Sequence, residues 1–513
     1  MRGKLRFEVI IRILADALLM SAATLLCVAV RAWLLGQSYS PKSLFLFLKT
    51  AAFLSVCGPA VFSAFGFYTK GHSYCSKYKL LTIAQASSTL FVCFAPVNYL
   101  VLSRGVPSRF MVAITWLFAT ALLVASRLWS HAWRVVVERE QAAARRNLSR
   151  EERKVLLIGG AGYIGSSLLP RLLERGHKVR LLDAFIYGVE PVVGYFEHPN
   201  LEVVRADFRN IHDVVCAMRG VSDVIHLGAI VGDPACALDE DLTVEINLRA
   251  TRTIAEVAKA NGVRNFIFAS TCSVYGASKQ LLDERSALNP VSLYARSKIA
   301  CEHVLTSLRD QEFAPTLLRF GTIYGLSGRT RFDLVVNLLA AKAVMEGMIT
   351  IFGPDQWRPF LHVHDASRAL VTVLETRPEQ LGQIVFNVGS DEQNFTLGSV
   401  GETIQKMVPA AELLCSEGDG DRRDYRVDFA RIRKALGFLP EWQLEDGIQQ
   451  VLDAVRSGAV LDYRDPKYSN VKFLGEENGL ELLKGNGRWA EDLVRSAAAP
   501  SWQTAYAAVL SSR

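Results

Sequence analysis

The sequence predicts an α/β protein in which a doubly wound parallel sheet, with a smaller C-terminal subdomain, follows a four-helix α domain that spans a membrane. Half of the 513 residues are hydrophobic, and the apolar excess is concentrated before Arg134. From Lys154 onward, short apolar runs rich in β-branched residues alternate with helical stretches. We therefore expect four parts, namely a transmembrane anchor over 1–133, a basic connecting helix over 134–153, the parallel-sheet domain with its interleaved subdomain over 154–464, and a tail of unknown role over 465–513.

Four N-terminal segments are each apolar over about 20 residues, the length of helix that crosses about 30 Å of hydrocarbon. Basic residues lie before the first segment, between the second and third, and after the fourth, which predicts a cytoplasmic N-terminus and a cytoplasmic C-terminal domain. The alternative is the buried helical core of a soluble domain, which the basic connectors disfavour. The segments run approximately from Val9 to Leu35, Leu44 to Phe67, Leu80 to Ser103 and Phe110 to Trp133.

The formal net charge of +7 points to a lipid bilayer rather than to nucleic acid. Lysine and arginine cluster beside the apolar segments and between Arg134 and Lys154, where they would face anionic headgroups. The nine cysteines are scattered, with no CxxC pair and no Cys/His spacing typical of a metal site. This distribution indicates reduced thiols in a cytosolic context and no bound metal.

The first of six predicted strands runs into GGAGYIG, in which Gly159, Gly162 and Gly165 open a helix. Backbone amides at a helix N-terminus can hold a pyrophosphate, and glycine permits its close approach. A purely structural turn is the alternative reading of such a run. The six strand-like runs are KVLLIGG, HKVRLLDA, LEVVRADF, VSDVIHLGA, VRNFIFAST and APTLLRFG.

Two acidic residues follow the second and third predicted strands. Asp183 stands 18 residues after Gly165, where an acid binds the ribose hydroxyls of a dinucleotide. Because an acid disfavours a 2′-phosphate there, the cofactor predicted is NAD rather than NADP. Asp207 is placed to meet the adenine, with a turn or cap residue as the alternative.

Tyr294 and Lys298 are four residues apart and therefore share one face of a helix. A neighbouring ammonium can lower the pKa of the phenol towards neutrality, so that Tyr294 exchanges a proton with a sugar hydroxyl. Thr271, at the end of a predicted strand, can hydrogen-bond the same hydroxyl. A solvated helix face would explain an isolated Tyr/Lys pair, but this pair follows a glycine turn, a ribose acid and a strand-end threonine.

The motifs GGAGYIG, HLGA, EINLRAT, STCSVYG, YARSK, RFGTIYG and WRPFLHVHD follow one another between Lys154 and Ser457. In this order they resemble the extended short-chain dehydrogenase/reductase family, specifically its nucleotide-sugar epimerase/dehydratase branch typified by UDP-glucose 4-epimerase. The resemblance implies a Rossmann domain with a smaller substrate-binding subdomain, an NAD cofactor, a nucleotide-sugar substrate and a homodimer.

The same resemblance implies that Tyr294 is the catalytic acid/base, that Lys298 also contacts the nicotinamide ribose and that Thr271 orients the reacting hydroxyl. The cofactor-binding residues expected from the motifs and the resemblance are Gly159, Gly162, Tyr163, Ile164, Gly165, Asp183, Asp207, Phe208, Leu227, Gly228, Ala229, Asn247, Tyr294 and Lys298. The substrate-binding residues expected from it are Thr271, Asn337, Arg358, Asp421 and Arg423, although an exposed basic turn would also explain the arginines around Arg423.

Two departures from the family pattern concern the sugar. Dehydratases of this branch typically follow the threonine with acidic residues that move protons around C5 and C6, whereas Cys272 and Ser273 follow Thr271 here. Elimination of water is therefore disfavoured. Thr322 also stands where relatives often have an asparagine that contacts the substrate, which indicates an unusual sugar pocket.

The N-terminal part resembles the four-helix membrane region of polysaccharide-biosynthesis nucleotide-sugar dehydratases, through ILADALLMSAATLLCVAVR and FGFYTKGHSYCSKYKLLTIAQAS. In that group the anchor holds a cytoplasmic catalytic domain at the inner (plasma) membrane beside glycan-synthesis proteins, which are thus the partners implied. Its membrane-bound members often replace the catalytic tyrosine with methionine, but this chain keeps Tyr294.

The leading hypothesis is a membrane-anchored, NAD-dependent nucleotide-sugar 4-epimerase that acts through a transient 4-keto intermediate and supplies sugar for surface polysaccharide. A 4,6-dehydratase, a decarboxylase and a ketoreductase share the first step and remain alternatives. A non-catalytic NAD-binding scaffold is an alternative from another class, which the presence of both Tyr294 and Lys298 disfavours.

Overall fold

The computed structural model describes residues 2–36, 40–68, 79–98, 100, 109–146, 153–382, 384–416, 423–476 and 479–487. The chain divides into two compact units, Met1–Glu140 and Gln141–Arg513. The boundary falls inside the segment predicted as a connecting helix.

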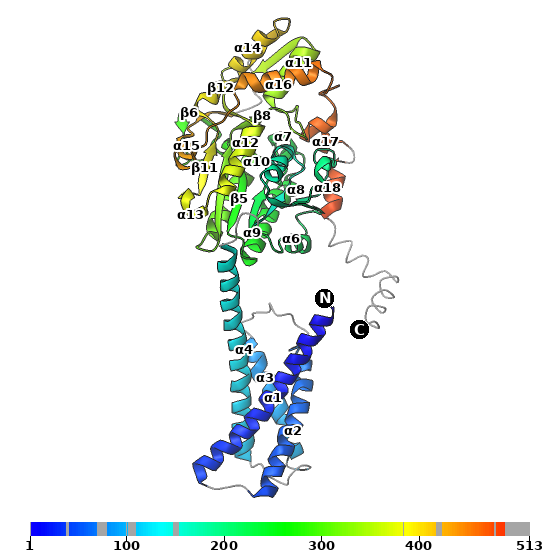
Figure 1. The fold of residues 1–513 in the computed structure, drawn as a ribbon, viewed down its shortest axis with the longest axis vertical. Helices are drawn as coiled ribbons and strands as arrows, with labels where there is room; N and C mark the ends of the chain where they lie inside the picture. The colour runs from blue at the N-terminus through cyan, green and yellow to red at the C-terminus, as the bar shows by residue number, and fades with distance from the viewer. Residues whose placement is uncertain are drawn as a thin grey trace, which may run out of the picture. The chain divides into compact units, whose positions relative to one another are not determined.

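The N-terminal unit consists, within its described residues, of four helices (Figure 1). Three contain stretches long and apolar enough to cross a membrane, namely Val9–Leu34, Leu44–Ala64 and Arg109–Trp129. The apolar part of the third helix in sequence, Leu81–Val97, is shorter, and most of the remainder of that predicted span lies outside the described residues. The helices are α1 (Arg2–Leu35), α2 (Pro41–Ala64), α3 (Lys79–Val97) and α4 (Arg109–Arg146).

Polar groups in this unit face one another, whereas large apolar side chains face outward. The buried carboxylate of Asp16 pairs with Arg127 at 2.7 Å and accepts a hydrogen bond from the Tyr68 hydroxyl at 2.9 Å. Such an arrangement suits a hydrocarbon surrounding, in which unpaired polar groups are costly. The outward side chains that are at least 70% exposed include Leu18, Trp33, Val56, Val92, Phe110 and Trp129.

The second unit is built on a seven-stranded parallel sheet with the order β11-β7-β5-β4-β1-β2-β3. All six strands predicted from the sequence are present, so the prediction of a doubly wound parallel sheet is confirmed; β11 is the additional strand. The order reverses direction between β1 and β4, which creates a crevice at the carboxyl ends of the strands. The strands are β1 (Lys154–Ile158), β2 (Lys178–Asp183), β3 (Leu201–Arg205), β4 (Asp223–His226), β5 (Asn265–Thr271), β7 (Ala314–Phe320) and β11 (Val385–Val388).

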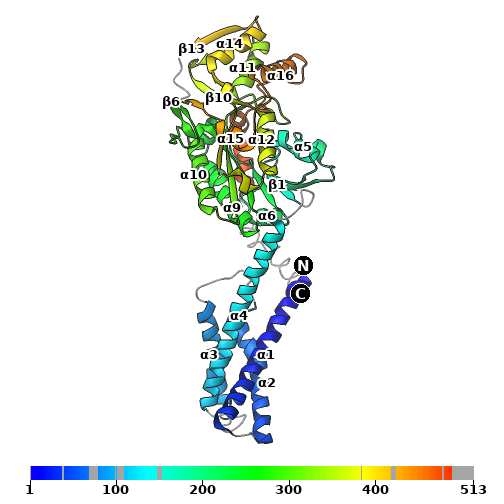
Figure 2. The ribbon, with the colours of Figure 1, turned by 60° about the vertical axis from the view of Figure 1, so that its left-hand side comes forward.

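Both faces of this sheet are buried, as the continuous apolar runs predict. In β1, Val155 and Leu157 join one hydrophobic cluster with α5 and α12, while Leu156 and Ile158 join a second cluster with α6, α9 and α10. Figure 2 shows α5 and α12 across the sheet from α9 and α10. The helices are α5 (Tyr163–Glu174), α6 (Ile211–Ala217), α9 (Ala250–Ala260), α10 (Leu293–Leu308) and α12 (Val363–Glu375).

A smaller subdomain with its own hydrophobic cluster lies beyond the carboxyl ends of the strands (Figure 1). In it, α11 (Val335–Met345), α14 (Leu397–Met407) and α16 (Leu444–Arg456) pack with the parallel pair β9 (Met348–Phe352) and β13 (Glu412–Ser416). Two further strand groups connect it to the large sheet. They are β8 (Thr322–Tyr324), β10 (Trp357–His362) and β12 (Asn394–Thr396), and the pair β6 (Ala277–Leu282) and β14 (Asp424–Val427).

Two buried histidines couple the stability of the second unit to pH. His226 hydrogen-bonds Thr251 at 2.9 Å, and His362 stacks on Trp442 with ring centroids 3.9 Å apart. Burial is the main influence that lowers the pKa of each imidazole from 6.5 to about 3. Both rings are therefore neutral in the folded protein at neutral pH.

We expect the free energy of unfolding of the second unit to fall as the pH decreases from about 6.5 towards 3. Over this window the unfolded chain binds protons that the folded imidazoles do not, at a cost of up to about 1.4 kcal/mol per pH unit for each histidine. Urea unfolding of the detergent-solubilised protein at successive pH values measures the slope. The His226→Gln and His362→Gln variants should each show a shallower slope, and unchanged slopes in both would contradict this origin.

Candidate active site

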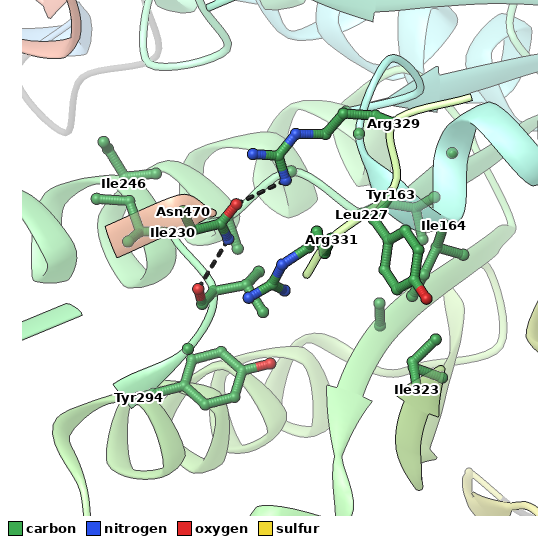
Figure 3. A pocket seen from close by; sticks show the side chains of 18 of the residues that line it. Tyr163, Ile164, Leu227, Ile230, Ile246, Tyr294, Ile323, Arg329, Arg331 and Asn470 are labelled. Carbon is green, nitrogen blue, oxygen red and sulfur yellow. Dashed lines mark hydrogen bonds between the residues drawn. The ribbon is translucent and has the colours of Figure 1, made fainter. Parts of the chain in front are cut away.

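A cavity of about 280 Å³ lies at the carboxyl ends of the parallel strands (Figure 3). It is lined by residues at the carboxyl ends of β1, β2, β3, β4, β5 and β7 or within two positions after them. Of the cofactor residues expected from the sequence, all but Asn247 line it. The sheet topology thus gathers motifs that are far apart in the chain.

The turn after β1 leaves no space for a side chain at Gly159 or Gly165. Gly159 has a φ of +78°, and a Cβ on it would lie 2.6 Å from the backbone nitrogen of Gly228. A Cβ on Gly165 would lie 2.4 Å from the Cα of Gly160. Gly162 is the N-cap of α5 and provides no side-chain hydrogen bond, so the first-turn amides of this helix remain available to an anionic group.

Asp183, at the end of β2, is held in place by backbone amides. Its carboxylate accepts hydrogen bonds from the amides of Ala161 at 2.9 Å and Phe185 at 2.8 Å. Burial raises the pKa of Asp183, while these amides lower it. Asp207 pairs with Arg209 at 2.6 Å beside the same part of the cavity.

Asn247 acts on the cavity wall without lining it. Its amide group accepts a hydrogen bond from the backbone nitrogen of Ile230 at 2.8 Å and donates one to the Ile230 carbonyl at 3.0 Å. Asn247 therefore fixes the loop after β4, which does line the cavity.

The three predicted catalytic residues all line the cavity. Tyr294 and Lys298 lie on α10, with the ammonium 5.9 Å from the centroid of the phenol ring. Lys298 also donates a hydrogen bond to the Ala269 carbonyl at 2.8 Å, which ties α10 to the end of β5. The Thr271 hydroxyl donates a hydrogen bond to Ser273 at 3.1 Å, and its interaction with Tyr294 lowers the pKa of the phenol.

The prediction that the ammonium lowers the pKa of the phenol is wrong for the protein by itself. Burial raises the pKa of Tyr294, and Cys236 and Asp233 raise it further, whereas Arg331 and the hydrogen bond with Thr271 lower it. Burial likewise lowers the pKa of Lys298. The helical spacing predicts which groups are neighbours, but desolvation of both groups outweighs their mutual interaction.

Residues 155–389 match the model of the NAD dependent epimerase/dehydratase family. These residues form a domain of that family. The fold, the glycine turn and the ribose acid agree with its NAD dependence, and NAD is the cofactor.

Several known proteins are similar to this chain over a longer stretch than the family model matches. The chain is 28% identical over 306 residues to the uncharacterised UDP-glucose epimerase YtcB of Bacillus subtilis, over 58% of this chain and 95% of that protein. It is 27% identical over 330 residues to UDP-glucuronic acid decarboxylase 2 of Arabidopsis thaliana, over 62% of this chain and 72% of that protein. The solved UDP-glucose 4-epimerase of Thermus thermophilus in complex with NAD is 26% identical, with a TM-score of 0.51, over 60% of this chain and 100% of that one.

The expected substrate residues of the epimerase/dehydratase domain and its subdomain do not all reach the cavity. Asn337 is fully buried, where its amide group bonds the Gly325 backbone at 2.8 and 3.1 Å and the Arg331 carbonyl at 2.8 Å. Arg358 is also buried and bonds the carbonyls of Trp357 and Arg423. Neither lines the cavity, and Arg358 also bonds the Gln356 side chain at 3.0 Å.

Arg423 does line the cavity, and it pairs with Asp233 at 3.6 Å. Thr271 lines it as well, whereas Asp421 lies outside the described residues. Three residues make up the two departures from the family pattern. Ser273 and Thr322 line the cavity, whereas the Cys272 thiol is buried and donates to the Arg319 carbonyl at 3.2 Å.

Two arginines of the epimerase/dehydratase domain were not anticipated. Arg329 and Arg331 follow the RFGTIYG motif, are buried and line the cavity. Arg331 is held by Asp333 through two hydrogen bonds of 2.9 Å. Arg329 lies over the Tyr187 ring, and its Nε and Nη2 atoms have no hydrogen-bond partner among the residues that the structure describes. The signal in the sequence that could have predicted these two site residues is the presence of two arginines in one loop directly after a family motif.

Proposed function

We propose that this protein is a membrane-anchored nucleotide-sugar 4-epimerase. The observation that carries the proposal is the gathering of Tyr294, Lys298 and Thr271 with the dinucleotide turn in one cavity. Among the described residues that line this cavity, the only acids are Asp183 and Asp207, which follow β2 and β3. Near Tyr294 the described lining therefore offers the proton carrier of an oxidation at C4 and no lining carboxylate, while Asp233, which does not line the cavity, pairs with Arg423.

The residues of the chain act as follows. Tyr294, as phenolate, takes the proton of the sugar 4-hydroxyl, while Thr271 hydrogen-bonds the same oxygen. Oxidised NAD supplies the hydride acceptor at C4 and a positive charge that favours the phenolate. The resulting 4-keto sugar turns within the cavity so that C4 presents its other face. The hydride would return to that face from the bound cofactor while Tyr294 gives its proton back to the C4 oxygen, so that C4 ends with inverted configuration. The cofactor is regenerated without an external reductant.

Recognition of the nucleotide diphosphate rests on arginine in this proposal. Arg329 is buried beside the cavity with two nitrogens that have no partner in the described part of the chain, and a buried guanidinium seeks an anionic group. Arg423 lines the cavity just before β14. A decarboxylase acting on a uronic acid sugar is the alternative that Arg329 favours, since a sugar carboxylate is equally a ligand for it.

The cellular part of the proposal rests on the N-terminal helices and on the resemblance of that region to membrane-bound glycan-synthesis enzymes. We infer that they anchor the protein in the plasma membrane with the catalytic domain in the cytoplasm. The protein would then supply a sugar for surface polysaccharide. The family resemblance adds that it would act as a homodimer.

The test is incubation of the detergent-solubilised protein with UDP-glucose, UDP-N-acetylglucosamine and UDP-glucuronic acid in separate reactions. The proposal expects one of them to give a product of unchanged mass with inverted configuration at C4, identified by mass spectrometry and NMR. A product lighter by water or by carbon dioxide would overturn the epimerase assignment in favour of a dehydratase or a decarboxylase.

A further inference from the structure

The tail to which the sequence assigns no role forms part of the cavity wall. Its described residues 465–476 and 479–487, here called the C-terminal segment, include α17 (Asn470–Gly475) and α18 (Gly479–Gly487). They lie outside residues 155–389, which match the family model. Asn470 and Leu483 of this segment nevertheless line the cavity.

Asn470 joins two parts of the wall near Tyr294. Figure 3 shows its side chain between Arg329 and the loop that carries Ile230. Its side-chain oxygen accepts a hydrogen bond from Arg329 at 2.6 Å, and its side-chain nitrogen donates one to the Val231 carbonyl at 2.9 Å. The backbone amide of Asn470 donates to Asp333 at 3.0 Å. Because Asn470 is itself buried and bonded on three sides, its position is closely defined.

The other end of the segment contacts the part of the cavity near Asp207. Arg209, which pairs with Asp207, also donates a hydrogen bond to the Leu483 carbonyl. Lys484 forms an ion pair with Asp239 at 3.0 Å. The segment is therefore attached both to Arg329 and the loop after β4, through Asn470, and beside the predicted adenosine site.

Apolar packing holds the segment between these two attachments. Leu474 and Leu483 are buried in a cluster with Ile230, Ile246 and residues of α7 (Asp233–Ala237) and α8 (Glu240–Val244). Phe473 packs on Tyr187, with ring centroids 4.8 Å apart, and Arg329 also lies over the Tyr187 ring. Figure 1 shows α17 and α18 beside α7 and α8.

We propose that the C-terminal segment completes the NAD site and retains the bound cofactor, with Asn470 and Leu483 as cofactor-site residues contributed from outside the family domain. Because the segment lines the cavity and is bonded at both of its ends, we expect its contacts to slow the release of a dinucleotide bound there. Retention suits an enzyme whose cofactor ends each turnover in the state in which it began. The proposal depends on NAD binding and not on which sugar is the substrate.

The experiment measures the exchange of bound NAD on the full-length, detergent-solubilised protein. The protein is loaded with isotopically labelled NAD and then mixed with excess unlabelled NAD, and the label that remains bound is followed by mass spectrometry. Asn470→Ala and Leu483→Ala should each release NAD at least about tenfold faster than the wild type, equivalent to about 1.4 kcal/mol.

Two matched variants separate retention from general destabilisation. Leu482 neighbours Leu483 on α18 but is 48% exposed, so Leu482→Ala should exchange NAD at the wild-type rate. Val460→Ala removes buried apolar volume in the smaller subdomain and should lower the melting temperature without faster release. Should Leu483→Ala fail to fold, Asn470→Ala and Lys484→Ala provide the result. Wild-type exchange rates in the folded variants of the segment would overturn the proposal.

Discussion

Replacement of Tyr294 by phenylalanine is expected to lower kcat by about a thousandfold, the usual contribution of a positioned acid/base. The change removes only the hydroxyl, and the ring keeps its packing in the cluster around Ile230. The bound NAD content of Tyr294→Phe should therefore equal that of the wild type. Turnover measured on the sugar nucleotide that the wild type accepts, together with the NAD content, checks both statements. Full turnover in this variant would favour a non-catalytic role for the tyrosine.

The pH profile provides an independent check of the same group. Because burial raises the pKa of Tyr294, the phenol is the predominant form at neutral pH and the reactive phenolate increases as the pH rises. We expect kcat/KM of the wild type to rise with pH on the alkaline side, and the residual activity of Tyr294→Phe to lack this rise.

Replacement of Arg319 by methionine is expected to cost about 3–5 kcal/mol of stability, the effect of leaving one buried charge without its partner. Arg319 on β7 forms two hydrogen bonds with Glu302 on α10, at 3.0 and 2.6 Å, and both side chains are 5% exposed. Glu302 also accepts a hydrogen bond from Ser270. Removal of the guanidinium leaves the carboxylate buried, and urea unfolding measures the loss.

Two comparisons show that the loss comes from the unpaired charge. The double variant Glu302→Leu with Arg319→Met should be less destabilised than the sum of the single variants, since it leaves neither charge behind. The exposed pair of Arg252 and Glu256 on α9, at 2.9 Å, should contribute less than about 1 kcal/mol. Equal losses at the two pairs would contradict the argument from burial.

The sequence is most informative where chemistry depends on local pattern. The β-branched runs predict the strands because a sheet covered on both faces needs apolar residues throughout. The glycine turn directly follows one predicted strand, and Asp183 ends the next. Both features are read from local sequence, and together they predict the cofactor site. Tyr294 and Lys298 are predicted to share a helical face because they are four residues apart.

Contacts between residues far apart in the sequence could not be predicted from such local patterns. Arg329 and Asn470 are 141 residues apart, and no local pattern relates them. Asn337 and Arg358 were expected to bind substrate, but they bond backbone groups that are distant in the sequence, Gly325 for Asn337 and Arg423 for Arg358. The pKa of Tyr294 also depends on burial, which the spacing of two residues does not reveal.

In the proposed reaction, Tyr294 and NAD together oxidise and then reduce one carbon of the sugar. The most direct test uses a nucleotide-sugar that the wild type converts, with deuterium at C4. The account predicts that the epimerised product keeps the deuterium at C4 and gains no hydrogen there from water. Loss of deuterium to the solvent, with hydrogen from water in its place, would contradict oxidation at C4 and require a different chemistry.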